Sequence, residues 1–170
     1  MKSPFAIPFV GLKLGLHEFE FDIDKSFFES LPYSLIEDGR LTAYLELEKK
    51  ETMLIANMEI VGFIFTTCDR CTEPLSQEID GEFTLYYTFG EEESEDENLI
   101  VLAPESYQID ISQPLYELIS LSLPAKLVHE PDECNEEMVA LLAKYQQPAP
   151  SSKPDQDDID PRWSALKNLN

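Results

Sequence analysis

Two of the three cysteines in the sequence stand close together, as Cys68-Asp69-Arg70-Cys71. The third is Cys134, and His129 precedes it at the spacing His-x4-Cys. Thiolates and imidazole nitrogens are preferred ligands of Zn²⁺, and a structural zinc site normally has four of them. Cys68, Cys71, His129 and Cys134 therefore form a candidate Cys3His zinc site, with two ligands from a C-x-x-C pair and two from much later in the chain.

Three interpretations of the C-x-x-C pair stay open from the residues alone. A metal site suits two cysteines in a hairpin turn. A thioredoxin-type redox pair needs its first cysteine at the N-terminus of a helix, whereas the flanks of Cys68 and Cys71 are strand-like on both sides. The third interpretation is that both are small, partly buried turn residues without a ligand, because a lone C-x-x-C is only half a site.

The sequence shows no motif of a common enzyme class. Its six glycines are not spaced as in a phosphate-binding loop. His17 and His129 are the only imidazole bases, and neither stands in a recognisable triad context. Carboxylates are too numerous for a catalytic pair to be singled out. We therefore predict a protein that is not an enzyme and works by binding a partner.

The charge of the chain restricts its partners. Asp and Glu number 34 against 12 Lys and Arg, for a formal net charge of −22, and residues 71–125 contain no Lys or Arg. Nucleic-acid binding depends on basic side chains that neutralise phosphates, so we expect no direct binding to bare RNA or DNA. The charge favours a basic partner and speeds the encounter with it. Solubility alone is an equally acceptable reason for the charge.

Nothing in the sequence indicates secretion or a membrane span. The first residues do not form a signal peptide, because the apolar stretch after Met1 is interrupted by Pro8, Lys13 and His17. No run reaches the roughly 18 apolar residues that a transmembrane helix requires. An odd number of cysteines does not make a secreted disulfide framework. We predict a cytoplasmic protein that does not bind membranes.

The first hundred or so residues are rich in β-strand patterns. Apolar and polar residues alternate from Leu41 to Leu47, and long β-rich runs cover Met53–Thr67 and Ile79–Phe89, so the C-x-x-C pair should lie in a hairpin turn. The leucines before His17–Glu18 and the phenylalanines after it alternate in opposite phase, which predicts a bulge or bend there. Short strands are expected at 99–102 and 107–111.

Helical patterns follow in the second half. A short helix begins after Asp24, and two longer helices are expected, one after Ser112 as a cap and one from Glu136 to about Gln146 with Asn135 as its cap. The predicted class is α+β. An antiparallel β-sheet or partly closed barrel forms the N-terminal part, and two helices pack on it. A short C-terminal helix follows a flexible linker.

The domain boundaries follow from composition. Residues 1–146 are predicted to form a single α+β domain with an acidic loop at about 90–98, and residues 147–159 form a flexible linker rich in Pro, Ser and Asp. Residues 160–170 are predicted to form a docking helix, in which Arg162, Trp163 and Leu166 are candidate partner-binding residues. Packing of this helix on its own domain is an equally acceptable interpretation.

Four motifs in order resemble those of the YceD family, the large ribosomal RNA subunit accumulation proteins. They are Thr67–Pro74 with its C-x-R-C, the segment Ile109–Pro124 that ends in L-x-L-P, His129-Glu130 with Cys134, and Asp160–Leu166 with D-P-R-x-x-x-L. The resemblance implies a bacterial, non-enzymatic factor that supports accumulation of 23S rRNA and large-subunit biogenesis. It also implies a large-subunit ribosomal protein or a pre-ribosomal particle as the partner.

A second function stays open beside this one. The C-x-x-C pair at Cys68 and Cys71 would also suit a cytoplasmic metal-binding or thiol redox-sensing protein. No cofactor follows with certainty from the sequence; zinc at Cys68, Cys71, His129 and Cys134 is the candidate.

Overall fold

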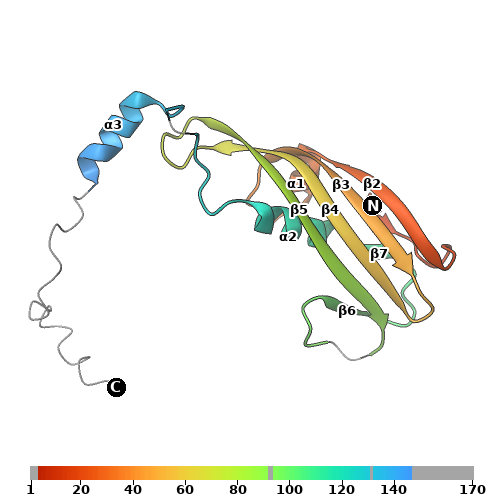
Figure 1. Ribbon diagram of the computed structural model, residues 1–170. Coiled ribbons are helices and arrows are strands. Elements are labelled where there is room, and N and C mark those ends of the chain that lie inside the picture. The colour runs from red at the N-terminus through yellow and green to blue at the C-terminus, as the bar shows by residue number, and fades with distance from the viewer. Residues whose placement is uncertain (1–3, 92–93, 131, 147–170) are drawn as a thin grey trace, which may run out of the picture. The chain divides into compact units, whose positions relative to one another are not determined.

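The computed structural model describes residues 4–91, 94–130 and 132–146 of the chain. They form an α+β fold, which confirms the predicted class. The elements in chain order are β1 (Ala6–Ile7), β2 (Gly15–Ile23), α1 (Lys25–Ser30), β3 (Asp38–Lys49), β4 (Met53–Thr67), β5 (Pro74–Phe89), β6 (Leu99–Leu102), β7 (Ile109–Asp110), α2 (Ser112–Ser122) and α3 (Glu136–Tyr145) (Figure 1).

Strands β2 to β6 form one sheet in chain order, and β1 pairs with β7 in a separate two-stranded sheet. Neighbours from β2 to β5 are antiparallel, as expected. The edge strands β2 and β6 do not pair with each other in the described part of the chain, so the sheet is open. The expectation of a partly closed barrel is therefore wrong.

The last strand of the large sheet, β6, lies parallel to β5, which the sequence did not indicate. Its register runs from Tyr86↔Leu99 to Phe89↔Leu102. Parallel neighbours usually need a crossover of about a dozen or more residues. Here β6 pairs only with the last four residues of β5. The connection over 90–98 therefore has to return only from the level of Phe89 to that of Tyr86, which is about 10 Å at ~3.3 Å per residue.

One face of the sheet, which we call the inner face, carries the hydrophobic core. Alternate residues of β3 from Leu41 to Leu47 point into it and are at most 3% exposed. Helix α1 packs on this face near Gly39, where an added Cβ would lie 3.1 Å from the ring of Phe28. Helix α2 packs near Gly81, where a side chain would collide with Ser122. Figure 1 shows both helices behind the strands.

The prediction that the two later helices cover the sheet is only partly right. Helix α2 buries Leu115, Leu118 and Ile119, as expected. Helix α1 is the second cover, because it buries Phe27 and Phe28, whereas α3 has no buried residue. None of the described helices is long and apolar enough to cross a membrane.

Two of the three predicted helix caps are correct. The side chain of Asp24 accepts a hydrogen bond from the backbone two residues later at the start of α1, and Asn135 accepts one from Met138 at the start of α3. Ser112, the predicted cap of α2, is instead its first residue. The carboxylate of Asp110 accepts from the Ser112 backbone at 2.9 Å and takes the place of a cap.

Strand β2 contradicts the predicted bulge at His17–Glu18. It pairs with β3 along its whole length in one unbroken register. Leu12 and Leu14 precede the strand, and Leu16 lies on the face opposite to Phe19 and is 56% exposed. The two alternating sets therefore need no common face. Phe19 and Phe21 pack against the core from β2, and Leu12 packs against it from the segment before the strand.

The described residues fall into two compact units. The first ends at Cys134 and contains both sheets with α1 and α2, and the second begins at Asn135 and contains α3. The predicted linker at 147–159 and the predicted helix at 160–170, with Arg162, Trp163 and Leu166, lie outside the described residues.

Tyr87 provides a test of the core. Its side chain is 2% exposed, and its hydroxyl has no hydrogen-bond partner among the described residues. Burial and the nearby Asp110 carboxylate raise the pKa of Tyr87 to about 12. Because an unpaired buried hydroxyl costs about 1–3 kcal/mol, Tyr87→Phe should leave the free energy of unfolding in urea unchanged or raise it by about 1 kcal/mol.

The matched comparison for this variant is Leu85→Ala, two residues away on the same strand and equally buried. It should lower the free energy of unfolding by about 2–5 kcal/mol. A comparable loss in Tyr87→Phe would mean that the hydroxyl has a partner, and our description of this part of the core would be wrong.

Candidate metal centre

The C-x-x-C pair lies in the tight turn between β4 and β5, as the sequence predicts. The backbone N–H of Cys68 donates to the carbonyl of Glu73 at 2.8 Å, and the N–H of Thr72 donates back to the carbonyl of Cys68 at 2.8 Å. Thr72 has a φ of +62°, which lets the chain reverse within a few residues. The backbone N–H of Arg70 points to the Cys68 sulfur at 3.4 Å. The turn thus directs both sulfurs to one side.

A second segment, from the end of α2 to Cys134, is fixed to this turn by Asp69. The backbone N–H of Asp69 donates to the carbonyl of Leu127 at 2.7 Å. The Asp69 carboxylate accepts from the backbone N–H of Leu127 at 2.8 Å. This pair of hydrogen bonds holds the later segment against the hairpin, and His129 follows two residues further on.

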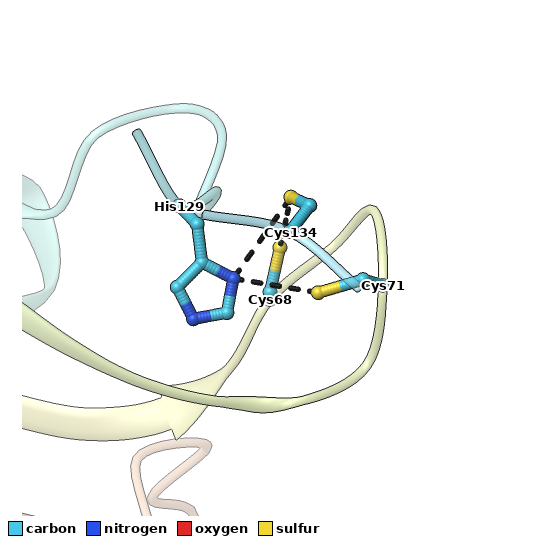
Figure 2. Close-up of side chains that lie close together, drawn as sticks. All are labelled: Cys68, Cys71, His129 and Cys134. Atoms are coloured by element: carbon cyan, nitrogen blue, oxygen red, sulfur yellow. Dashed lines mark hydrogen bonds between the residues drawn. The ribbon is translucent and has the colours of Figure 1, made fainter. Parts of the chain in front are cut away.

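The structure brings the four predicted ligands together, although they come from segments more than fifty residues apart (Figure 2). Their donor atoms all lie within 4.8 Å of one another. The Sγ atoms of Cys68 and Cys134 are 3.8 Å apart, and Nδ1 of His129 lies 3.3 Å from Sγ of Cys71 and 3.9 Å from Sγ of Cys134.

These separations fit a tetrahedral metal. With Zn–S near 2.3 Å and Zn–N near 2.0–2.1 Å, tetrahedral geometry places two sulfurs about 3.8 Å apart and a sulfur and a nitrogen about 3.5 Å apart. The observed distances scatter around these values. The cluster of Cys68, Cys71, His129 and Cys134, which we call the Cys3His cluster, can therefore hold a metal ion with little movement of its side chains.

The ring of His129 is oriented for binding through Nδ1. Its Nε2 lies 3.0 Å from the carbonyl oxygen of Pro74. A carbonyl oxygen can only accept, so Nε2 carries the proton and Nδ1 keeps its lone pair toward the cysteines. A hydrogen bond of this kind behind a ligating imidazole fixes its tautomer and increases its basicity.

The electrostatics of the cluster favour a thiolate at Cys68. Burial raises the pKa of the Cys68 thiol, but hydrogen bonds from the backbones of His129, Cys71 and Arg70 outweigh this and bring the pKa to about 6. Burial, together with the neighbouring Cys68 and Cys71, raises the pKa of Cys134. The hydrogen bond to Pro74, and then the one to Cys71, raises the pKa of His129. One sulfur is thus ready to bind a cation at neutral pH.

Arg70 places a positive charge beside this sulfur cluster. Its guanidinium lies 3.8 Å from the sulfur of Cys134. Three thiolates and one neutral imidazole around a divalent ion carry a net charge of −1, which an adjacent cation offsets. The arginine of the C-x-R-C motif therefore has a physical role here, which the spacing of the cysteines alone did not reveal.

The sequence did not single out Asp69 or Pro74, on which the geometry depends. Both stand beside the cysteines, but their contacts are with Leu127 and His129, far away in the chain. No local pattern reports such contacts. The cysteines and the histidine were found because they are few; Asp69 is one carboxylate among 34 acidic residues.

These features define a class of small α+β protein in which a Cys3His cluster joins a β-hairpin to a later segment. The chain belongs to the YceD family, because the sequence model described as "Large ribosomal RNA subunit accumulation protein YceD" matches residues 56–170. The match confirms the resemblance and includes β4 from Ala56 onward, the β4–β5 turn and all four cluster residues. No match was found among curated proteins or among solved structures.

Proposed function

We propose that this protein is a non-enzymatic accessory factor that supports accumulation of 23S rRNA in biogenesis of the large ribosomal subunit. The proposal rests on the match of residues 56–170 to a family whose members are described as large ribosomal RNA subunit accumulation proteins. The protein acts in the cytoplasm by binding a basic ribosomal protein, or an assembly particle that displays one.

The charge of the chain supports a protein partner. The chain has a net charge of −22, so a bare RNA backbone repels it. Basic proteins, such as those that neutralise the phosphates of ribosomal RNA, attract it. Its contact with an assembling subunit would therefore pass through a basic protein and depend on salt concentration.

Affinity purification of the tagged full-length protein from its own cells tests this proposal. We expect large-subunit ribosomal proteins and 23S rRNA precursors to co-purify at low salt, and to be lost at about 0.5 M salt because that screens exposed charges within a few ångströms. Partners identified by mass spectrometry that contain no ribosomal component would contradict the proposal.

The C-terminal segment is proposed to add to this contact through Arg162, Trp163 and Leu166. Arg and Trp are enriched among interface hot spots. Truncation after Gln147 should therefore leave the melting temperature unchanged and reduce co-purification with ribosomal material. If the truncated protein instead melts several degrees lower, the segment belongs to the fold and the docking role is wrong.

A second role, compatible with the first, follows from the Cys3His cluster. We propose that it binds one structural Zn²⁺ through the sulfurs of Cys68, Cys71 and Cys134 and Nδ1 of His129. The donor set and the separations of 3.3–3.9 Å support this. Bound zinc would link the hairpin to the segment that carries His129, so that both keep one conformation.

Asp69 should be a positioning residue for this site. Asp69→Ala removes the carboxylate that accepts from Leu127, and we expect zinc affinity to fall by about 10–100-fold, the usual effect of losing a group that orients a ligand. Asp69→Asn keeps an acceptor oxygen and is the matched control. Competition with a chromophoric chelator measures both; equal affinities for Asp69→Ala and the wild type would contradict the role.

The alternative function, thiol redox sensing, is the other use of the same residues. It is supported by the lowered pKa of Cys68 and by the 3.8 Å between the sulfurs of Cys68 and Cys134, which would have to approach to about 2.05 Å to form a disulfide. One zinc per chain with thiols resistant to mild oxidants favours the structural site. A metal-free protein that forms this disulfide reversibly favours the sensor.

A further inference from the structure

The face of the large sheet opposite to the core, which we call the outer face, is not covered by any element of the described part of residues 4–134. Five of its apolar side chains are 39–44% exposed: Tyr44, Val61, Phe63, Phe65 and Tyr86. These residues alternate with buried ones along β3, β4 and β5. Exposed aromatic side chains gathered on one face of a sheet mark an interaction surface more often than a solvated one.

The same face is strongly acidic. Glu20, Tyr44, Glu59 and Glu82 form one row across four strands, because Glu20 pairs with Tyr44, Tyr44 with Glu59 and Glu59 with Glu82. Glu18 and Glu46 form another directly opposed pair of carboxylates. Like charges directly opposite each other on neighbouring strands destabilise a sheet. Folding alone does not favour this arrangement.

Part of this face is a hollow of about 610 Å³. Its lining includes the carboxylates of Glu46, Glu59 and Glu82 and the rings of Tyr44 and Tyr86. Arg40 is the one basic residue among the positions of β2, β3, β4 and β5 that lie on the outer face. A guanidinium or ammonium group in the hollow would therefore meet carboxylates on several sides and the faces of tyrosine rings, both of which attract cations.

We propose that the outer face binds an arginine- and lysine-rich polypeptide segment of a partner protein. The proposal rests on the proposed function and assigns its partner contact to this surface. We infer the kind of partner from charge complementarity. The opposed carboxylates of the outer face have few cations beside them in this chain, so the partner must supply positive charges. A second copy of this chain does not fit, since it would bring a face of the same sign and a further net charge of −22.

The test compares two triple variants of the full-length protein. Glu20→Gln, Glu59→Gln and Glu82→Gln together neutralise the central row of the outer face. Glu91→Gln, Glu95→Gln and Glu97→Gln together remove the same charge from exposed positions in the connection between β5 and β6, none of which lines the hollow. The probe is a fluorescent oligo-arginine peptide, and its binding is measured by anisotropy at about 0.05 M salt.

We expect the outer-face variant to bind the peptide about tenfold more weakly, since it loses three exposed carboxylates that pair with the cations of the peptide. The connection variant should lose less than about threefold. The outer-face variant should also unfold at a temperature no lower than the wild type, because it removes like-charge repulsion. If both triple variants bind the peptide equally weakly, the peptide responds only to the net charge of the protein, and the proposal is overturned.

Co-purification from cells separates failure of this surface from failure of the proposed function. The outer-face variant should lose ribosomal material that the wild type and the connection variant retain. If all three proteins retain that material, the proposed function stands and the outer face is not the contact. If the wild type itself retains none, both proposals fail. A dimer of the wild type that the outer-face substitutions abolish would identify a second copy as the occupant and overturn the inference.

Discussion

Replacing Cys68 or Cys71 by serine is expected to abolish zinc binding and to release the segment that carries His129 from the β4–β5 hairpin. Each substitution removes one of four donors whose atoms lie within 4.8 Å of one another. A structural zinc site contributes about 10–16 kcal/mol of binding free energy at neutral pH. Three ligands cannot retain most of it, so elemental analysis should find less than one zinc per chain.

The expected structural effect is local. None of the four ligands belongs to the main hydrophobic cluster of the sheet. We therefore expect the amide resonances of residues 68–73 and 125–134 to broaden or shift, and those of β3 and β4 to stay in place. Removal of metal from the wild type with a chelator should reproduce this spectrum.

The two histidines of the chain provide the control. His129→Asn should lower zinc affinity at least about a hundredfold, since it removes a direct ligand. His17→Asn should not change it, because His17 lies opposite Leu47 of β3, contacts the carbonyl of Lys13 and is not part of the cluster. If His129→Asn binds zinc as tightly as the wild type, the Cys3His assignment is wrong.

Gly62→Ala is expected to destabilise the protein by at least about 3 kcal/mol, among the largest effects of any single substitution. Gly62 has a φ of +152°, a conformation that residues with a side chain rarely adopt. Its Cβ would lie 2.6 Å from Cα of Leu41 and would also collide with the carbonyl oxygen of Arg40, on the neighbouring strand β3. Backbone atoms inside a sheet cannot move aside without breaking the register of β3 and β4.

Gly11→Ala is the matched control, because an added Cβ there meets nothing within 4 Å. It should change the free energy of unfolding by less than about 0.5 kcal/mol. Urea unfolding of both variants measures the difference. A Gly62→Ala protein as stable as the wild type would mean that β3 and β4 do not approach as closely as described.

The long antiparallel strands could be predicted from sequence because alternation records which residues share a face. The pattern from Leu41 to Leu47 is buried as expected. Alternation does not record strand direction, so the parallel pairing of β6 was missed. Alternation also does not show which face of the sheet is covered. In β4 both alternating sets of residues are apolar, yet Ile60 and Ile64 are buried whereas Phe63 and Phe65 are exposed. Only the positions of α1 and α2 decide this.

The candidate site could be predicted in part for a different reason. Three cysteines and two histidines leave few combinations of ligands, so the four residues could be named. Their convergence depends on the hydrogen bonds between Asp69 and Leu127 and between His129 and Pro74. These contacts join residues more than fifty positions apart, and the order of residues along one chain does not record them.

The proposed support of large-subunit rRNA accumulation can be measured in cells. The most direct measurement is the ratio of 23S to 16S rRNA in cells of the source organism that lack the gene. We expect a ratio below that of the parent strain. The full-length wild-type protein should restore it, whereas the Glu20, Glu59 and Glu82 triple variant, produced at the same level, should not. An unchanged ratio in cells without any of the protein would contradict it.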